Sequence, residues 1–125
     1  MTEVKKKILI VDDDPDILEL YKTGLEDFGF EVLVAANGQE GLDQIRVDAP
    51  DLVLLDIMLP QVHGLDVLAK IRADEATKNL KVIVLSALSE QSTIGRAREL
   101  GIDDYIVKSL YSMQEIISKI KAALS

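Results

Sequence analysis

The sequence contains no cysteine, so neither a disulfide framework nor a thiolate metal site is possible. It also lacks any apolar run near the ~18 residues that a membrane-spanning helix needs. The lysine-rich start, residues 1–7, leads into only about five apolar residues, too few for the apolar region of a signal peptide. We therefore expect a cytoplasmic protein that does not insert into membranes.

Basic residues are also scarce, since 14 Lys and Arg stand against 22 Asp and Glu and give a net charge of −8. This balance argues against direct nucleic-acid binding by the domain, because phosphate binding depends on clustered Lys and Arg. The sequence contains neither of the glycine-rich phosphate-binding motifs, Gly-x-Gly-x-x-Gly and Gly-x-x-x-x-Gly-Lys-[Ser/Thr]. Their absence from the sequence disfavours a nucleotide-binding protein of flavodoxin-like fold. With 125 residues and 48% hydrophobic content, the chain suits one domain with one core, spanning residues 1–125.

The chain is organised around the stretch DLVLLDIMLP, residues 51–60. Residues 52–55 form an unbroken apolar run, which predicts a strand buried on both faces in the middle of a parallel sheet. The run ends in Asp56, and Pro60 follows to stop the sheet. Taken alone, Asp56 is as readily an ordinary strand-end residue as a functional one.

Strand and helix patterns alternate five times along the chain. The predicted strands are residues 7–11, 31–36, 52–55, 82–86 and 105–108. Cap signals predict where the intervening helices begin or end: Asp14 before Pro15, Gly29, Asn37 and Ser112 in capping boxes, Ser89, and Gly101. The first helix carries an apolar stripe that we expect to be buried and that includes Phe28. This alternation predicts an α/β fold, a doubly wound five-stranded parallel sheet with helices on both faces.

Polar residues lie at the carboxyl ends of four of the five predicted strands: Asp12 and Asp13, Asp56, Ser86, and Lys108. In such sheets ligands bind outside the carboxyl ends of the strands, so we expect these side chains to share one rim. Two carboxylates ~4 Å apart repel by roughly 4 kcal/mol at an effective dielectric near 20, so three acids together need either raised pKa values or a cation. An all-oxygen ligand set suits Mg²⁺ or Mn²⁺ rather than zinc. A carboxylate can also act as a nucleophile toward phosphorus.

The stretches ILIVDDDP, DLVLLDIMLP, VIVLSA and DDYIVK resemble the receiver domain of two-component response regulators, over roughly residues 5–123. The resemblance implies the flavodoxin-like strand order 2-1-3-4-5. It implies that Asp56 is the phosphoryl acceptor and that Asp12, Asp13, Asp56 and the backbone carbonyl of Met58 bind Mg²⁺. The Met58 thioether itself is an unsuitable ligand, because soft sulfur does not suit a hard cation.

The resemblance further implies that Lys108 pairs with the phosphoryl group, that Ser86 supplies a hydroxyl, and that Tyr105 is the aromatic residue that changes rotamer on activation. The implied function is a signalling switch that catalyses only its own phosphorylation and dephosphorylation and is otherwise not an enzyme. Its partners would be a histidine kinase or histidine phosphotransfer protein and an unidentified output protein. The face that would change comprises the fourth helix, the fifth strand and the fifth helix.

Two positions depart from the family pattern. His63 stands where the family commonly has Asp, and we expect it to be an exposed loop residue. Ser109 follows Lys108 where the family usually has Pro. Because a cis bond before a residue other than proline costs about 2.5–4 kcal/mol, we predict a trans Lys108–Ser109 peptide.

Two other functions remain open at this point. A phosphorylation-independent interaction domain of the same fold would be expected to have lost one of the acids, and all of them are present. A hydrolase working through an aspartyl phosphate would usually have a second acid two residues after the nucleophile, where this chain has Met58.

Overall fold

Strands and helices alternate in the computed structural model, which describes residues 5–59 and 63–125. The strands are β1 (Lys7–Val11), β2 (Glu31–Ala35), β3 (Leu52–Leu55), β4 (Lys81–Ser86) and β5 (Asp104–Val107). The helices are α1 (Pro15–Phe28), α2 (Gly38–Asp48), α3 (Gly64–Ala73), α4 (Gln91–Leu100) and α5 (Met113–Leu124), with a short 3-10 turn at Lys108–Leu110. The proposed stop at Pro60 and the start of the chain before Lys5 lie outside the described residues.

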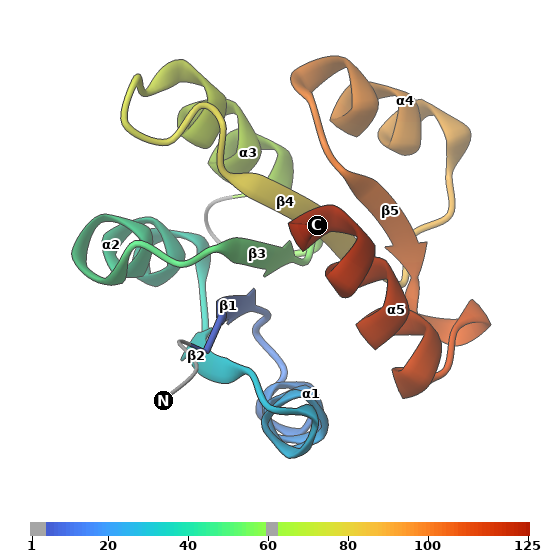
Figure 1. Ribbon diagram of the computed structural model, residues 1–125. Coiled ribbons are helices and arrows are strands. Elements are labelled where there is room, and N and C mark those ends of the chain that lie inside the picture. Colours follow the sequence, from blue (N-terminus) through green and yellow to red (C-terminus); the bar gives the residue numbers. More distant parts are fainter. Residues whose placement is uncertain (1–4, 60–62) are drawn as a thin grey trace.

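The five strands form one parallel sheet in the order β2-β1-β3-β4-β5, which confirms the predicted fold (Figure 1). Because successive side chains of a strand point to opposite faces, β1 contributes to two separate cores. Ile8 and Ile10 pack with residues of α1 and α5, whereas Leu9 and Val11 pack with residues of α2, α3 and α4. This covering of both faces explains why β3 is apolar at every position.

Three of the cap signals have the expected geometry. The Asp14 side chain accepts hydrogen bonds from the first turn of α1, and Gly29 ends that helix in the left-handed region at φ 116°. Ser112 and Glu115 form a reciprocal capping box at the start of α5. Asn37 accepts from the Glu40 amide, but the Glu40 carboxylate accepts from Ala36 rather than from Asn37.

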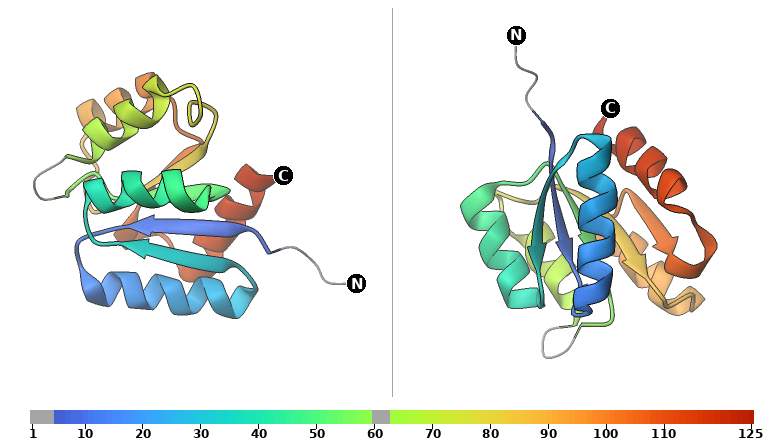
Figure 2. Two further views of the ribbon diagram at one scale, coloured as in Figure 1. Left: turned by 90° about the vertical axis from the view of Figure 1, so that its left-hand side faces the viewer. Right: turned by 90° about the horizontal axis from the view of Figure 1, so that it is seen from below.

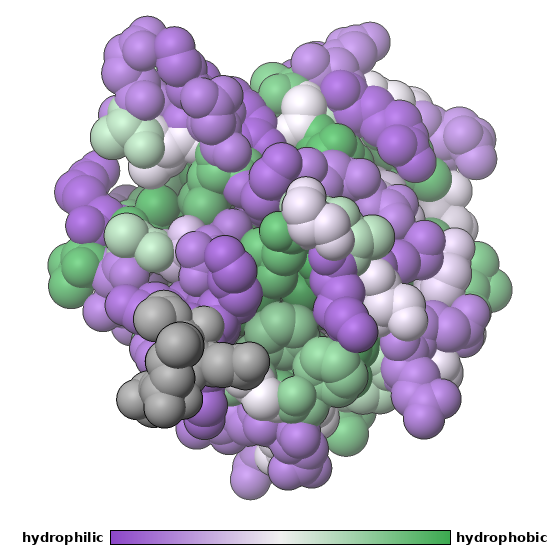
Figure 3. Space-filling model, in the orientation of Figure 1, coloured by the Kyte–Doolittle hydropathy of each residue, from purple (hydrophilic) through white to green (hydrophobic). Residues whose placement is uncertain are grey.

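Two expectations about the helices were wrong. Glu90, not Ser89, precedes α4, and the Glu90 side chain makes no capping hydrogen bond to the described part of that helix. Phe28 is 49% exposed, while Phe30, just past the end of α1, is buried instead. The Lys121 ammonium lies 5.1 Å from the centre of the Phe28 ring, a cation–π contact that accounts for an aromatic ring left at the surface. Figure 3 shows that apolar surface lies between α1 and α5.

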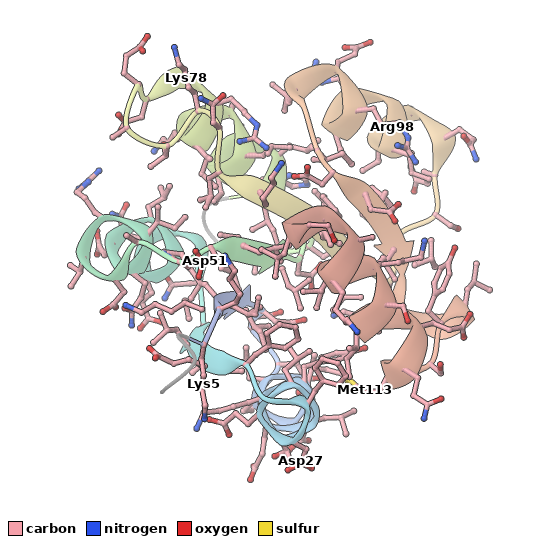
Figure 4. The ribbon with its side chains drawn as sticks, in the orientation of Figure 1. Lys5, Asp27, Asp51, Lys78, Arg98 and Met113 are labelled. Carbon is pink, nitrogen blue, oxygen red and sulfur yellow. The ribbon has the colours of Figure 1, made fainter. Side chains whose placement is uncertain are left out.

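Two aspartates lock neighbouring strands together at the amino-terminal end of the sheet. The Asp51 amide donates to the Lys7 carbonyl, and the Lys7 amide donates to the Asp51 carboxylate at 2.7 Å. Asp51 is labelled in Figure 4. Asp103 makes the same pair of bonds with Val82, both at 2.8 Å. In each pair the carboxylate accepts the strand amide that a backbone carbonyl would accept in a regular parallel ladder.

Among the described residues, none of the helices combines the length and apolarity that crossing a bilayer would take.

Candidate functional site

The carboxyl ends of β1, β3, β4 and β5 carry the polar residues that the sequence singled out. Asp12, Asp56 and Ser86 are buried there, with exposed surface fractions of 2%, 5% and 0%. In the left-hand view of Figure 2 these strand ends lie toward the left, at the opposite end from the amino terminus. Buried carboxylates need hydrogen bonds or cations, so the contacts of Asp12 and Asp56 decide what the site can do.

Asp12 and Asp56 have matching hydrogen bonds. One carboxylate oxygen of Asp12 accepts the Asp14 amide at 3.0 Å, and one oxygen of Asp56 accepts the Met58 amide at 2.9 Å. Each is a local turn in which an aspartate bonds the backbone two residues further on. These bonds hold both carboxylates in one orientation and leave the second oxygen, Oδ2, of each for another partner.

That partner is Lys108, which lies between the two carboxylates. Its ammonium is 2.5 Å from Asp12 Oδ2 and 3.3 Å from Asp56 Oδ2. Burial alone would lower the pKa of Lys108, but the hydrogen bonds and charges of Asp12 and Asp56 outweigh burial and raise it. Lys108 is therefore charged at neutral pH.

The backbone around Lys108 follows one prediction and departs from another. The sequence pattern predicted that Lys108 ends the fifth strand, but β5 ends at Val107 and Lys108 begins the 3-10 turn that follows. The peptide bond to Ser109 is trans, as predicted. A trans bond at this position is thus compatible with a lysine that reaches both acids.

Asp13 completes an acidic cluster whose ligand oxygens, with those of Asp12 and Asp56, all lie within 4.8 Å of one another. Three carboxyl groups share the one Lys108 ammonium, so the single positive charge of Lys108 does not match theirs. Burial raises the pKa of Asp12 despite its bond to Lys108. Asp13 is exposed, which leaves the cluster open to solvent on one side. A set of carboxylate oxygens with access for water fits Mg²⁺ or Mn²⁺.

The charge imbalance predicts that neutralising Asp13 stabilises the metal-free protein. Asp13→Asn removes a charge near Asp12 and Asp56, and within residues 5–59 and 63–125 the Asp13 side chain makes no hydrogen bond or ion pair that would be lost. We expect the free energy of unfolding in chelator to rise by about 1 kcal/mol. Thermal melts with and without added Mg²⁺ measure this, and Mg²⁺ should narrow the difference. A variant that melts below wild type in chelator would show that the acids do not repel.

Ser86 and Tyr105 are connected through the backbone of Leu88, a residue that the sequence pattern did not single out. The Leu88 amide donates to the Ser86 hydroxyl oxygen at 3.2 Å, and the Leu88 carbonyl accepts from the Tyr105 hydroxyl at 2.9 Å. Tyr105 is buried, and burial raises its pKa, so the phenol keeps its proton. The loop between β4 and α4 thus joins both residues.

The start of α3 lies directly against the Asp56 backbone. His63 is exposed, as expected, but its ring also caps α3 by accepting the Leu65 amide at 3.2 Å. The Gly64 amide donates to the Ile57 carbonyl, and a Cβ on Gly64 would lie 2.3 Å from the Asp56 carbonyl oxygen. Only glycine fits this approach. Gly64 is visible in the sequence, but the close approach that requires a glycine there depends on the fold.

A parallel flavodoxin-like sheet with acids clustered at its carboxyl edge defines the class of protein. The family model of the response regulator receiver domain matches residues 8–121. The chain belongs to this family of two-component signalling domains.

Relatives of known sequence and structure agree with this assignment. The phosphate regulon transcriptional regulatory protein PhoB of Pseudomonas aeruginosa is 40% identical over 97% of the chain and 52% of its own length. The alkaline phosphatase synthesis transcriptional regulatory protein PhoP of Bacillus subtilis is 36% identical over 97% of the chain and 49% of its own. The chain therefore spans about half the length of these curated relatives. A solved receiver domain protein from Methanospirillum hungatei is 35% identical, with a TM-score of 0.90 over 97% of this chain and 94% of that one.

Proposed function

We propose that this receiver domain is a phosphorylation-dependent switch in which Asp56 accepts a phosphoryl group from a phosphohistidine of a kinase or phosphotransfer protein. The observation that carries the proposal is the position of the Asp56 carboxylate. One oxygen is held by the Met58 amide, and the other faces the Lys108 ammonium beside Asp12. An oriented carboxylate next to a fixed cation is suited to attack phosphorus, because the cation can pair with the transferred oxygens.

The reaction would proceed in two displacements. An Asp56 oxygen forms the new bond to phosphorus as the bond from phosphorus to the donor's imidazole nitrogen breaks. Water later attacks the phosphorus, releases inorganic phosphate and restores the carboxylate. Lys108 and the Ser86 hydroxyl would pair with the phosphoryl oxygens in between. The domain would catalyse these steps only on itself.

Asp12, Asp13, Asp56 and the Met58 carbonyl would hold the Mg²⁺ ion, or Mn²⁺ in its place. When bound, the metal neutralises charge on the phosphoryl oxygens. The donor set supports this assignment, because all the side-chain ligands are carboxylates within reach of one another. Burial raises the pKa of the Asp12 carboxyl even with Lys108 beside it, and a bound cation would favour its charged form.

Metal binding can be tested without phosphorylation. We expect Mg²⁺ affinity in wild type to fall as pH drops toward the raised pKa of Asp12, because the ligands must be deprotonated. Asp13→Ala should lose about tenfold or more in affinity, as expected for a missing charged ligand. Isothermal titration with Mg²⁺ measures both effects, and Asp16→Ala on the exposed first turn of α1 is the control. Unchanged affinity in Asp13→Ala would remove Asp13 from the ligand set.

The switch itself would pass through Leu88. A Ser86 hydroxyl drawn toward a phosphoryl group changes its bond with the Leu88 amide, and the Leu88 carbonyl holds the Tyr105 hydroxyl. Moving this loop would release Tyr105 to another rotamer and alter the α4-β5-α5 face. The receiver domain of Klebsiella pneumoniae RstA, solved in a BeF3-activated form, is 28% identical with a TM-score of 0.88 over 95% of this chain and 98% of that one, which supports a comparable activated state here.

The proposal extends to partners and setting. A histidine kinase or histidine phosphotransfer protein would supply the phosphoryl group, and another protein or domain would respond to the altered face. The domain would act in the cytoplasm as one receiver unit over residues 1–125, without binding nucleic acid itself. Mass spectrometry after incubation with a small phosphodonor tests the central step, with Asp56→Asn as the comparison.

A further inference from the structure

Strand β2 is the outer strand of the sheet, and one side of its backbone faces away from β1. In a parallel ladder the N–H and C=O of one residue point to the same neighbour, and alternate residues point to opposite sides. The Glu31 amide donates to Lys6 and the Ala35 carbonyl accepts from Asp12, so residues 31, 33 and 35 face β1. The backbone groups of Val32 and Val34 therefore point outward. Across residues 5–59 and 63–125, nothing hydrogen-bonds to them.

The surface beside this edge combines apolar and acidic side chains. Val34 is 37% exposed and Val47 of α2 is 80% exposed, and together they line a shallow hollow between β2 and α2. Glu40, Asp43 and Gln44 complete the lining. The left-hand view of Figure 2 looks onto this edge, with α1 on one side of the sheet and α2 on the other.

Negative charge is concentrated in the segment that forms this edge. Residues 15–48 contain eight acidic and two basic residues, a net charge of −6, against −8 for the whole chain. Of the six large apolar residues that are exposed in residues 5–59 and 63–125, four fall in the same segment: Leu20, Phe28, Val34 and Val47. A second copy of the chain would bring two such edges together and be repelled, so charge complementarity favours a basic occupant.

We propose that the outer edge of β2 binds an extended, basic segment of a partner protein by strand addition. The segment's backbone would bond to the outward groups of Val32 and Val34, which gives affinity without regard to sequence. Its apolar side chains would rest on Val34 and Val47, and its Lys or Arg side chains would lie near Glu40 and Asp43. Because β1 lies between β2 and the Asp56 strand, the proposed surface does not include the phosphoryl acceptor.

The test uses the unphosphorylated full chain and a blocked seven-residue peptide of alternating lysine and valine. We expect binding that weakens as salt is added, together with shifts and slowed exchange of the Val32 and Val34 amides in NMR spectra. An alternating glutamate and valine peptide should not bind. A lysine and valine peptide with N-methyl groups on alternate backbone nitrogens should also fail, because it cannot donate to the edge.

Two charge-reversal variants distinguish peptide binding at the β2 edge from general attraction of a basic peptide to an acidic protein. Asp43→Lys at the edge should weaken peptide binding by about tenfold, as charged rims typically respond. Glu99→Lys on α4 makes the same charge change at an exposed position far along the sheet order and should leave binding unchanged. Equal weakening by both variants, undiminished binding of the N-methylated peptide, or no binding at all would each overturn the proposal. Thermal melts establish that both variants are folded.

Discussion

Incubation with Mg²⁺ and acetyl phosphate is expected to add one acyl phosphate to the wild-type chain and none to Asp56→Asn. The asparagine amide is almost the same size as the carboxylate, but it lacks the anionic oxygen that attacks phosphorus. Asp56 is also the carboxylate that pairs through one oxygen with Lys108 while the Met58 amide holds the other. Intact-protein mass spectrometry, followed by hydroxylamine treatment to cleave acyl phosphates, measures the outcome.

Two further variants make this result specific. Asp66→Asn changes an exposed acid on α3 in the same way and should be labelled like wild type. Lys108→Ala should lose the conformational change that accompanies phosphorylation, since a phosphoryl oxygen goes without its cation. Full labelling of Asp56→Asn would assign the nucleophile elsewhere. A wild-type chain that is never labelled would favour the phosphorylation-independent interaction domain.

Replacing Gly64 with alanine is expected to destabilise the protein by about 3 kcal/mol, at the upper end for an overpacked position. The added Cβ would lie 2.3 Å from the Asp56 carbonyl oxygen and 2.5 Å from the Ile57 Cα. Both are backbone atoms of the segment that holds the acidic site, so neither can move without disturbing Asp56. Urea denaturation measures the loss, and slower labelling of Asp56 should accompany it.

Gly95 provides the matched control, because it is also a helical glycine and a Cβ there would meet nothing within 4 Å. Gly95→Ala should stabilise the protein by about 0.5–1 kcal/mol, the usual gain from replacing glycine in a helix. If Gly64→Ala were as stable as wild type, α3 would have to be able to move away from Asp56.

Much of the fold could be predicted because its signals repeat along the chain. Leu52–Leu55 is apolar at every position since β3 is covered on both faces, and alternation with helices then requires parallel strands. The site followed from the same logic, because parallel strands gather their carboxyl ends at one edge. That edge brings together Asp12, Asp13, Asp56 and Lys108.

The features that escaped prediction depend on backbone geometry or on a choice between neighbours. The role of Leu88 belongs to its amide and carbonyl, which every residue but proline has, so its side chain gives no signal. Ser89 and Glu90 could each have preceded α4, and the path of the loop decides between them. Phe28 follows the apolar spacing of α1 but is exposed, whereas Phe30, one residue past the turn at Gly29, is buried.

The aspartates that directly precede β3 and β5 have a mechanical consequence for signalling. Asp51 hydrogen-bonds to both the amide and the carbonyl of Lys7, and Asp103 does the same with Val82. A one-residue slip of either strand pair would therefore break two hydrogen bonds at once. The strands are thereby anchored at the end farthest from Asp56 and cannot slide lengthwise. A displacement that starts at the carboxyl ends of the strands, beside Asp56, therefore passes from one loop to the next across the strands. The sheet stays rigid while those loops move.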